Sequence, residues 1–210
     1  MKSQLKLSGG RKLQSPRGLT TRPTTSKVRE AVMNIVGRKI QGCNWLDLCS
    51  GTGIMSCEAL QRGARRVVAL DHNKKTAQVC KENLLAIAKS QKEKIYVEVF
   101  CREVISFLKK GCKVSKGDEK KSPRFDLVYL DPPYESEIYP SVLKLLLEGN
   151  WLNNESIVIC EHSSSIDLNT PCPWIEKDRR KYGNSALLLI SPPLNHHVDT
   201  DSMQQRIVPG

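Results

Sequence analysis

The sequence contains no long run of apolar residues. None of its hydrophobic stretches approaches the roughly 18 residues that a membrane-spanning helix needs. Residues 1–7 also lack the apolar stretch on which a secretory signal peptide depends. We therefore expect a cytoplasmic protein that has no membrane among its partners. At 210 residues, the chain is long enough for one well-buried domain.

Metal-ligand spacing is absent as well. The eight cysteines include no Cys-x-x-Cys pair, and the four histidines show no spacing typical of a metal site. Cys57, Cys80 and Cys160 fall within stretches that we interpret as helix or strand, where a free thiol acts as a small hydrophobe. We expect no bound metal, and a reducing, cytosolic compartment fits this use of cysteine best.

Acids are scarce at the start of the chain. Residues 1–40 hold ten Lys or Arg against the single acid Glu30, so they supply +9 of the formal net charge of +11. This asymmetry favours a basic arm that contacts phosphates, the alternative being a merely solvated N-terminus. Aromatic residues make up only 5% of the sequence, which does not favour a stacking platform for long single strands. The candidate phosphate contacts are Arg11, Lys12, Arg22, Lys27 and Arg29.

A helix is expected at the end of this basic region. It begins after Pro23, carries an apolar stripe from Val28 to Val36 and ends at Gly37. Residues 1–22 are rich in glycine, proline and charge, so we expect them to be extended or loosely ordered. The chain is thus divided into a basic arm and helix over 1–40, an α/β domain over 41–192 and a disordered tail over 193–210.

From residue 44 onward, strand-like and helix-like segments alternate. Apolar runs of strand length lie at 44–48, 66–70, 94–100, 125–130 and 156–161. Helical patterns lie at 54–62, 73–89, 103–110 and about 137–147, and a closing hairpin is expected over 174–190. The polar segment 111–124 is long for a connection, so it is either disordered or functional. This order predicts an α/β fold with a Rossmann-like, doubly wound sheet of seven strands, mostly parallel, with a C-terminal antiparallel hairpin.

A glycine-containing turn follows the first expected strand. Gly51 and Gly53 let the backbone turn tightly and approach a ligand closely. Asp71 lies 20 residues after Gly51 and ends the second strand, where an acid can accept hydrogen bonds from ribose hydroxyls. The two features together indicate a nucleoside-containing cofactor.

Two cofactors compete for this site. An NAD site would place a third glycine where Ser56 stands, because the helix there faces a pyrophosphate. S-adenosylmethionine (SAM) has no phosphate and does not need that glycine, and Asp47 is placed to orient its cationic amino acid moiety. Glu103 follows the third strand and is placed to take an adenine amino group, although a solvated glutamate at a helix start is an equal alternative. The pattern favours SAM.

The tetrapeptide Asp131-Pro132-Pro133-Tyr134 directly follows the apolar run 125–130. Prolines cannot extend a central strand, so they fix the acid and the aromatic ring at the strand's carboxyl end, where α/β sheets bind ligands. The Asp131 carboxylate and the Pro132 carbonyl are placed to accept the N–H groups of an exocyclic amine, and Tyr134 is placed to stack on a flipped base. A proline-rich turn with a packing tyrosine is the alternative interpretation.

With these residues together, the chain resembles the RsmD family, the bacterial 16S rRNA (guanine(966)-N(2))-methyltransferases. The resemblance covers about residues 5–190, and the Arg-Pro-Thr-Thr helix entry is its most particular part. It implies a class I SAM-dependent fold, methyl transfer to a guanine N2, and 16S-type rRNA as partner, in an assembled or assembling small subunit. The segments that carry it are Arg22–Glu30, Leu46–Gly53, Glu58–Leu60, Asp71, Ser106–Leu108 and Asp131–Tyr134.

Other functions stay open at this point. An adenine-N6 methyltransferase uses the same acid-Pro-Pro-aromatic box, although no added target-recognition domain is present. An NAD-dependent oxidoreductase is disfavoured by Ser56 and by the prolines. A non-catalytic RNA-binding protein has no need for Asp47, Asp71 and Asp131 at three strand ends.

Overall fold

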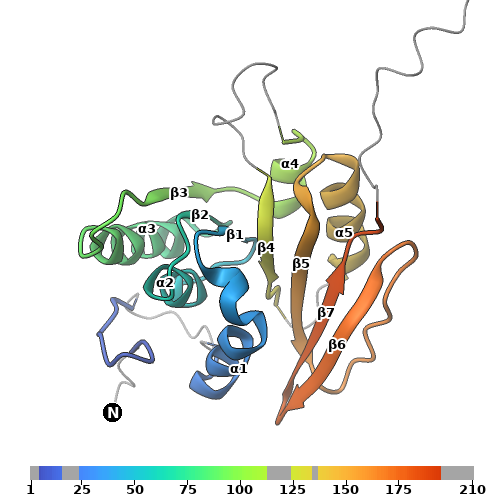
Figure 1. Ribbon diagram of the computed structural model, residues 1–210, viewed down its shortest axis with the longest axis horizontal. Coiled ribbons are helices and arrows are strands. Elements are labelled where there is room, and N and C mark those ends of the chain that lie inside the picture. Colours follow the sequence, from blue (N-terminus) through green and yellow to red (C-terminus); the bar gives the residue numbers. More distant parts are fainter. Residues whose placement is uncertain (1–4, 16–23, 113–123, 134–136, 195–210) are drawn as a thin grey trace, which may run out of the picture.

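A seven-stranded sheet with the strand order β3-β2-β1-β4-β5-β7-β6 runs through the middle of the molecule (Figure 1). The computed structural model describes residues 5–15, 24–112, 124–133 and 137–194. Strands β1 to β5 are parallel, and β7 pairs antiparallel with both β5 and β6. The predicted α/β fold is confirmed. The strands are β1 (Asn44–Asp47), β2 (Arg66–Asp71), β3 (Tyr96–Cys101), β4 (Phe125–Leu130), β5 (Leu152–Ser163), β6 (Ile175–Tyr182) and β7 (Ser185–Ser191).

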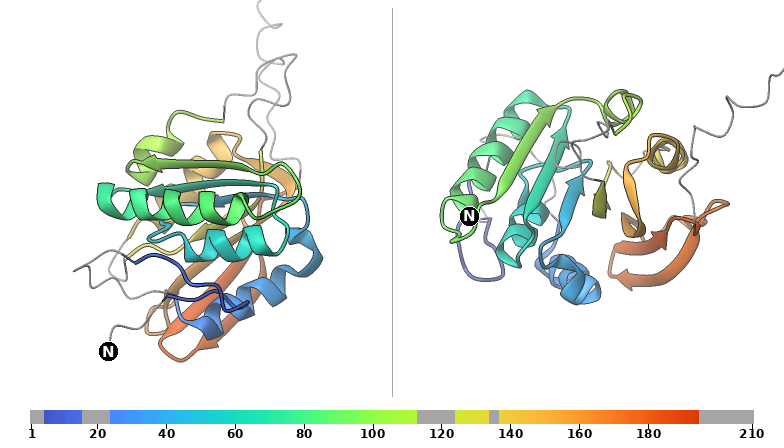
Figure 2. Two further views of the ribbon diagram at one scale, coloured as in Figure 1. Left: turned by 90° about the vertical axis from the view of Figure 1, so that its left-hand side faces the viewer. Right: turned by 45° about the horizontal axis from the view of Figure 1, so that its top comes forward.

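Helices cover both faces of the sheet (Figure 2). One face packs against α1 (Ser26–Val36), α2 (Ile54–Gln61) and α3 (Lys74–Ala88), with the short 3-10 helix Gly37–Ile40 following α1. The other face packs against α4 (Val104–Leu108) and α5 (Tyr139–Glu148). No helix in the described ranges is long and apolar enough to cross a membrane.

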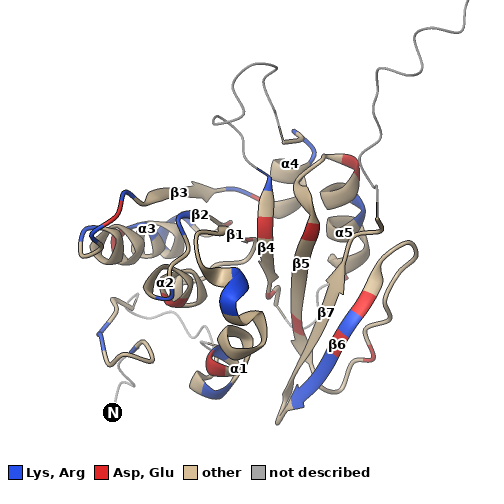
Figure 3. Cartoon of the chain, viewed as in Figure 1, with Lys and Arg blue, Asp and Glu red and all other residues tan. Residues whose placement is uncertain are grey.

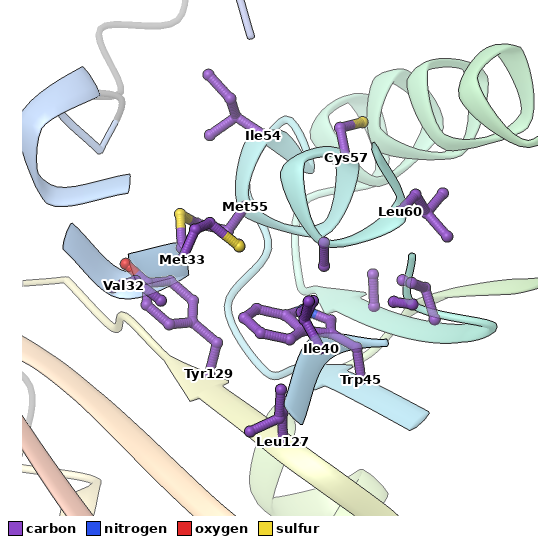
Figure 4. Packing of buried hydrophobic residues seen from close by; sticks show 14 of the residues in the cluster. Val32, Met33, Ile40, Trp45, Ile54, Met55, Cys57, Leu60, Leu127 and Tyr129 are labelled. Atoms are coloured by element: carbon purple, nitrogen blue, oxygen red, sulfur yellow. The ribbon is translucent and has the colours of Figure 1, made fainter. Parts of the chain in front are cut away.

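Buried side chains from α1, α2 and the sheet converge in the layer shown in Figure 4. Trp45 of β1 and Tyr129 of β4 stack with their ring centroids 6.0 Å apart, and both are fully buried. They lie beneath Met33 of α1 and Met55 of α2, which are also buried. This packing fixes α1, and the chain just before it, against the strands that carry the functional side chains.

Two elements differ in length from the sequence prediction by more than two residues. Strand β5 begins at Leu152 rather than Ser156, because buried Leu152 already pairs with Phe125 of β4, and the polar residues 153–155 that follow it interrupt the apolar pattern in the sequence. Helix α4 is shorter than the expected 103–110, since only one turn of it, around Phe107, packs into the core. The segment 113–123 and the tail 195–210 lie outside the described residues, so the expectations for them are not tested.

The start of the chain is more ordered than its composition suggested. Residues 5–15 fold back on themselves, with Leu7 N donating to Arg11 O at 2.9 Å and Leu13 N donating to Leu5 O at 2.9 Å. The side chains of Leu5, Leu7 and Leu13 are buried against the α1–α2 layer. The expectation of a loosely ordered arm is therefore wrong for residues 5–15, because three leucines spaced among the charges anchor it to the core.

Candidate active site

A cavity of about 720 Å³ opens at the carboxyl ends of β1, β2, β4 and β5. This is the edge at which open α/β sheets bind ligands, because strand ends and loops there leave a crevice. Four acids at or near the ends of these strands line it: Asp47, Asp71, Asp131 and Glu161. Three of them were predicted from the sequence, and Glu161 was not.

The glycine turn after β1 has the conformation that its sequence requires. Gly51 has φ +53° and Gly53 has φ +78°, a region that side chains with a Cβ rarely adopt. A Cβ on Gly53 would also lie 2.6 Å from the Sγ of Cys80 on α3. The turn therefore brings bare backbone to the cavity wall and lets α2 start close to the sheet.

Asp47 is buried beneath this turn. Its Oδ2 accepts a hydrogen bond from Ser56 Oγ at 2.6 Å, while its Oδ1 has no hydrogen-bond partner among the described residues. Burial raises the pKa of Asp47 to about 7, partly offset by the Ser56 hydroxyl and increased by the charge of Asp71. A buried carboxylate oxygen without a partner, in the wall of a cavity, can accept a hydrogen bond from a ligand. Ser56, which replaces the third glycine of a dinucleotide site, thus holds this acid.

Asp71 lies at the end of β2, next to the glycine turn. Its Oδ2 accepts from Gly51 N at 3.0 Å and its Oδ1 accepts from Asn73 N at 2.7 Å. Burial raises its pKa, against the lowering effect of these amides. Each carboxylate oxygen keeps a further acceptor site for a ligand hydroxyl. Glu103 is exposed at the rim of the same cavity, just before α4, and makes no side-chain cap to that helix.

The corner after β4 lines the same cavity, next to the turn after β1, because these two strands are neighbours in the sheet. Asp131, buried Pro132 and exposed Pro133 all line it, and Thr24 Oγ1 donates to Asp131 Oδ2 at 3.3 Å. Burial and the charges of Glu161 and Asp47 raise the pKa of Asp131 well above its usual value. The cavity thus joins the two halves of the site that the sequence predicted. Tyr134 lies outside the described residues.

Glu161 is the acid that the sequence analysis missed. It lies near the end of β5, is 2% exposed and lines the cavity, and its Oε2 accepts a hydrogen bond from Tyr129 Oη. Tyr139 Oη donates to its backbone carbonyl at 2.6 Å. The available signal was its position at the end of the expected strand 156–161, which parallels that of the other three acids. Thr24 was also given no individual role.

The predicted phosphate contacts have different environments. Arg29 is buried, donates to Thr24 O at 2.7 Å and Lys6 O at 2.9 Å, and forms an ion pair with buried Glu58 at 3.5 Å. The prediction that Arg29 contacts phosphate is therefore wrong, because its guanidinium is buried and already paired with Glu58. Lys12 and Lys27 are exposed.

Arg11 holds the N-terminal segment in place. Its guanidinium donates to Ser90 Oγ and to Ala86 O, both at 2.7 Å, at the end of α3. Arg22 lies outside the described residues. Figure 3 also shows Lys and Arg along the second half of β6, where Arg179 and Arg180 pair with neighbouring acids. No cluster of three or more potential metal ligands occurs in the described ranges.

Comparison with known proteins places this architecture in a family. The family model described as "Conserved hypothetical protein 95" matches residues 7–191. The chain belongs to this family. A relative from Haemophilus influenzae named "Ribosomal RNA small subunit methyltransferase D" is 32% identical over 165 residues, which cover 79% of this chain and 80% of the relative. The resemblance to the RsmD family is thereby confirmed.

Solved structures share the fold of this RsmD-family chain. A conserved hypothetical protein from Streptococcus pyogenes has a TM-score of 0.65 and 26% identity, covering 81% of this chain and 98% of its own. The structure of SMU.776 complexed with SAH has a TM-score of 0.59 and 15% identity, covering 80% of this chain and 49% of its own. The second likeness is one of fold alone.

Proposed function

We propose that this protein transfers a methyl group from SAM to the exocyclic N2 of a guanine in small-subunit rRNA, in the cytoplasm. One observation carries the proposal: the Asp131-Pro132 corner and the glycine turn above Asp47 open into one cavity of about 720 Å³. An acceptor pair for an amine thus faces a site for a nucleoside cofactor. Membership of the RsmD family supports rRNA as the substrate class.

Residues of the first three strand ends would hold the cofactor. The unpartnered Oδ1 of Asp47 fits the cationic amino group, and the Asp71 carboxylate fits the ribose hydroxyls. Glu103 at the rim fits the adenine amino group. When bound there, SAM supplies an electrophilic methyl group.

The Asp131-Pro132 corner would orient the amine that accepts this methyl group. An aromatic amine is a weak nucleophile because its lone pair is delocalised into the ring. If Asp131 and the Pro132 carbonyl accept its two N–H bonds, the nitrogen is drawn towards a tetrahedral geometry in which the lone pair becomes available. Positioning of this kind can supply most of the rate effect without a metal or strong base. Tyr134 would stack on the flipped base.

Phosphate contacts would come from the exposed lysines near the N-terminus, Lys12 and Lys27, with Arg22 and Arg11 as further candidates. Contacts with phosphates raise the affinity for RNA but do not distinguish one base sequence from another. The specificity would therefore come from the shape of the RNA and from an exposed base. The adenine-N6 alternative is not favoured, because the similarity to the rRNA methyltransferase relative covers most of this chain. The NAD alternative is not favoured, because Ser56 stands where a third glycine is expected and donates a hydrogen bond to Asp47.

The test is methylation of small ribosomal subunits, and of naked 16S rRNA, by the purified protein with methyl-labelled SAM. Nucleoside mass spectrometry should find label in N2-methylguanosine at one position. Label in N6-methyladenosine, or no transfer to either substrate, would contradict the proposal. Comparison of the two substrates also decides whether the enzyme acts on free RNA or on a particle.

The pKa of Asp47 predicts how the affinity for SAM depends on pH. Because burial raises that pKa to about 7, the carboxyl is largely protonated in the free protein at pH 5 to 6. A cationic ligand favours the ionised form, so binding should release a proton, and affinity should rise almost tenfold per pH unit below 7. Affinity should level off near pH 7 and fall as the ligand's α-amino group deprotonates at about 8.

Calorimetric titration at several pH values, in buffers of different ionisation enthalpy, measures both the affinity and the proton release. Asp47→Asn keeps the shape and can still accept the Ser56 hydrogen bond, so it should bind weakly and without this pH dependence below 7. A wild-type affinity that stays constant between pH 5.5 and 7 would rule out the proposed role of Asp47.

A further inference from the structure

Glu161 of β5 lies near Asp131, the residue that directly follows β4. Strands β4 and β5 pair in parallel with Tyr129 opposite Ile159 and Leu130 opposite Cys160. Continuing this register by one residue puts Asp131 opposite Glu161. Residues opposite each other in neighbouring strands project to the same face of a sheet, with strands about 4.8 Å apart. Both side chains line the cavity, and the charge of Glu161 raises the pKa of Asp131.

Two carboxylates side by side match the edge of one purine. In guanine, the N2 amine and the ring N1–H are adjacent hydrogen-bond donors. In adenine, the N6 amine is adjacent to N1, which is an acceptor. A carboxylate placed next to the amine-binding corner therefore attracts guanine and repels the N1 lone pair of adenine. A site built around a substrate N–H strongly rejects an analogue that lacks it.

We infer that Glu161 is a specificity-determining residue that accepts the N1–H of the target guanine, while Asp131 and Pro132 hold its N2 amine. The inference rests on the proposed function and adds to it the group that separates guanine from adenine. Asp131 and its two prolines cannot make this distinction, because they contact only the amine, which both bases have.

The surroundings of Glu161 hold its carboxylate in one orientation. Tyr129 Oη donates to Oε2, and Tyr139 Oη fixes the backbone carbonyl of the same residue. Tyr129 is itself locked by its stacking on Trp45 in the core. A carboxylate has about four acceptor sites, so it can accept from Tyr129 and from a ligand. Preorganised acceptors on strands are more precise than acceptors on loops.

The experiment uses substrate RNA that carries either guanine or 2-aminopurine at the target position. The analogue keeps the N2 amine but lacks the N1–H. Loss of a hydrogen bond to a charged acceptor should lower kcat/KM of the wild-type enzyme for 2-aminopurine by roughly 100-fold relative to guanine. Glu161→Gln keeps the side-chain volume and offers an N–H₂ donor to the analogue's N1. It should reduce the preference for guanine to about tenfold or less.

Glu155→Gln is the matched control, because it neutralises an exposed carboxylate on the same strand, and it should keep the wild-type preference. Tyr129→Phe, which removes only the hydroxyl that holds Glu161, should reduce the preference by a smaller factor. SAM affinity and the unfolding temperature show that each variant is folded. The preference is a ratio within one variant, so a general loss of activity does not change it.

Equal losses on both bases in Glu161→Gln would assign Glu161 a structural role and overturn the inference. A wild-type enzyme that methylates guanine and 2-aminopurine equally well would overturn it too, while leaving the proposed function intact. A wild-type enzyme that methylates no guanine N2 would overturn the proposed function, and the inference with it.

Discussion

Replacing Asp131 by alanine should lower kcat for methyl transfer by about 1,000-fold while the affinity for SAM stays within about twofold. Asp131 lines the cavity at the corner after β4, and among the described hydrogen bonds its Oδ2 contacts only Thr24 and no residue of the glycine turn. Its loss should therefore remove the acceptor that orients the amine and leave the cofactor end of the cavity unchanged.

Single-turnover rates with labelled SAM measure the transfer step, and calorimetry measures SAM binding. Asp131→Asn is the informative companion, because its amide oxygen can still accept one N–H and should preserve a measurable rate. Glu155→Gln again serves as the control for loss of a carboxylate elsewhere. A fully active Asp131→Ala enzyme would show that the amine is not held at this corner.

Replacing Arg29 by alanine should lower the free energy of unfolding by about 3–5 kcal/mol. The substitution leaves Glu58, which is 1% exposed, without its ion-pair partner at 3.5 Å. It also removes the donors to Lys6 O and Thr24 O, which connect residues 5–15 and the start of α1. For a chain of this size, such a loss corresponds to a decrease of about 6–20 °C in the unfolding temperature.

Denaturant unfolding followed by circular dichroism measures this loss. Lys27→Ala is the matched control, because it removes an exposed charge from the same helix and should change stability by less than about 0.5 kcal/mol. The control should instead weaken RNA binding and make it less salt-dependent. The double variant Arg29→Met with Glu58→Gln removes both charges of the buried pair, so it should recover part of the stability that Arg29→Ala loses. Equal stability of the Arg29→Ala and Lys27→Ala proteins would mean that the buried pair contributes nothing.

Much of the site could be predicted because its signals are local in the chain. A glycine turn after one strand, an acid ending the next, and an acid-Pro-Pro corner after a third each occupy a few consecutive residues. Parallel strands bring their carboxyl ends to one edge, so Asp47, Asp71 and Asp131 were expected to meet, and all three line one cavity. The order of strands and helices followed in the same way from alternating apolar patterns.

The basic N-terminal region shows where such reasoning fails. Charge alone cannot tell a surface arginine from one that pairs with a buried acid far along the chain. Arg29 and Lys27 are two residues apart, yet Arg29 points into the core towards Glu58 and Lys27 points to solvent. Similarly, Leu5 and Leu7 alternate with a lysine over only three residues, which is too short to predict a strand, so only the contacts of Leu5, Leu7 and Leu13 with the core explain why residues 5–15 are ordered.

By itself, the sequence determined the α/β class of this protein, the glycine turn with the acids that end the first two strands, and the acidic corner after β4. The tertiary structure alone decided which side chains join that corner from elsewhere: Thr24 from the entry to α1 and Glu161 from β5. The physical reason is how far apart in the sequence the interacting residues lie. Turn and strand propensities act over a few residues, whereas strand register joins Leu130 to Cys160, 30 positions away, and a side-chain hydrogen bond joins Thr24 to Asp131, 107 positions away.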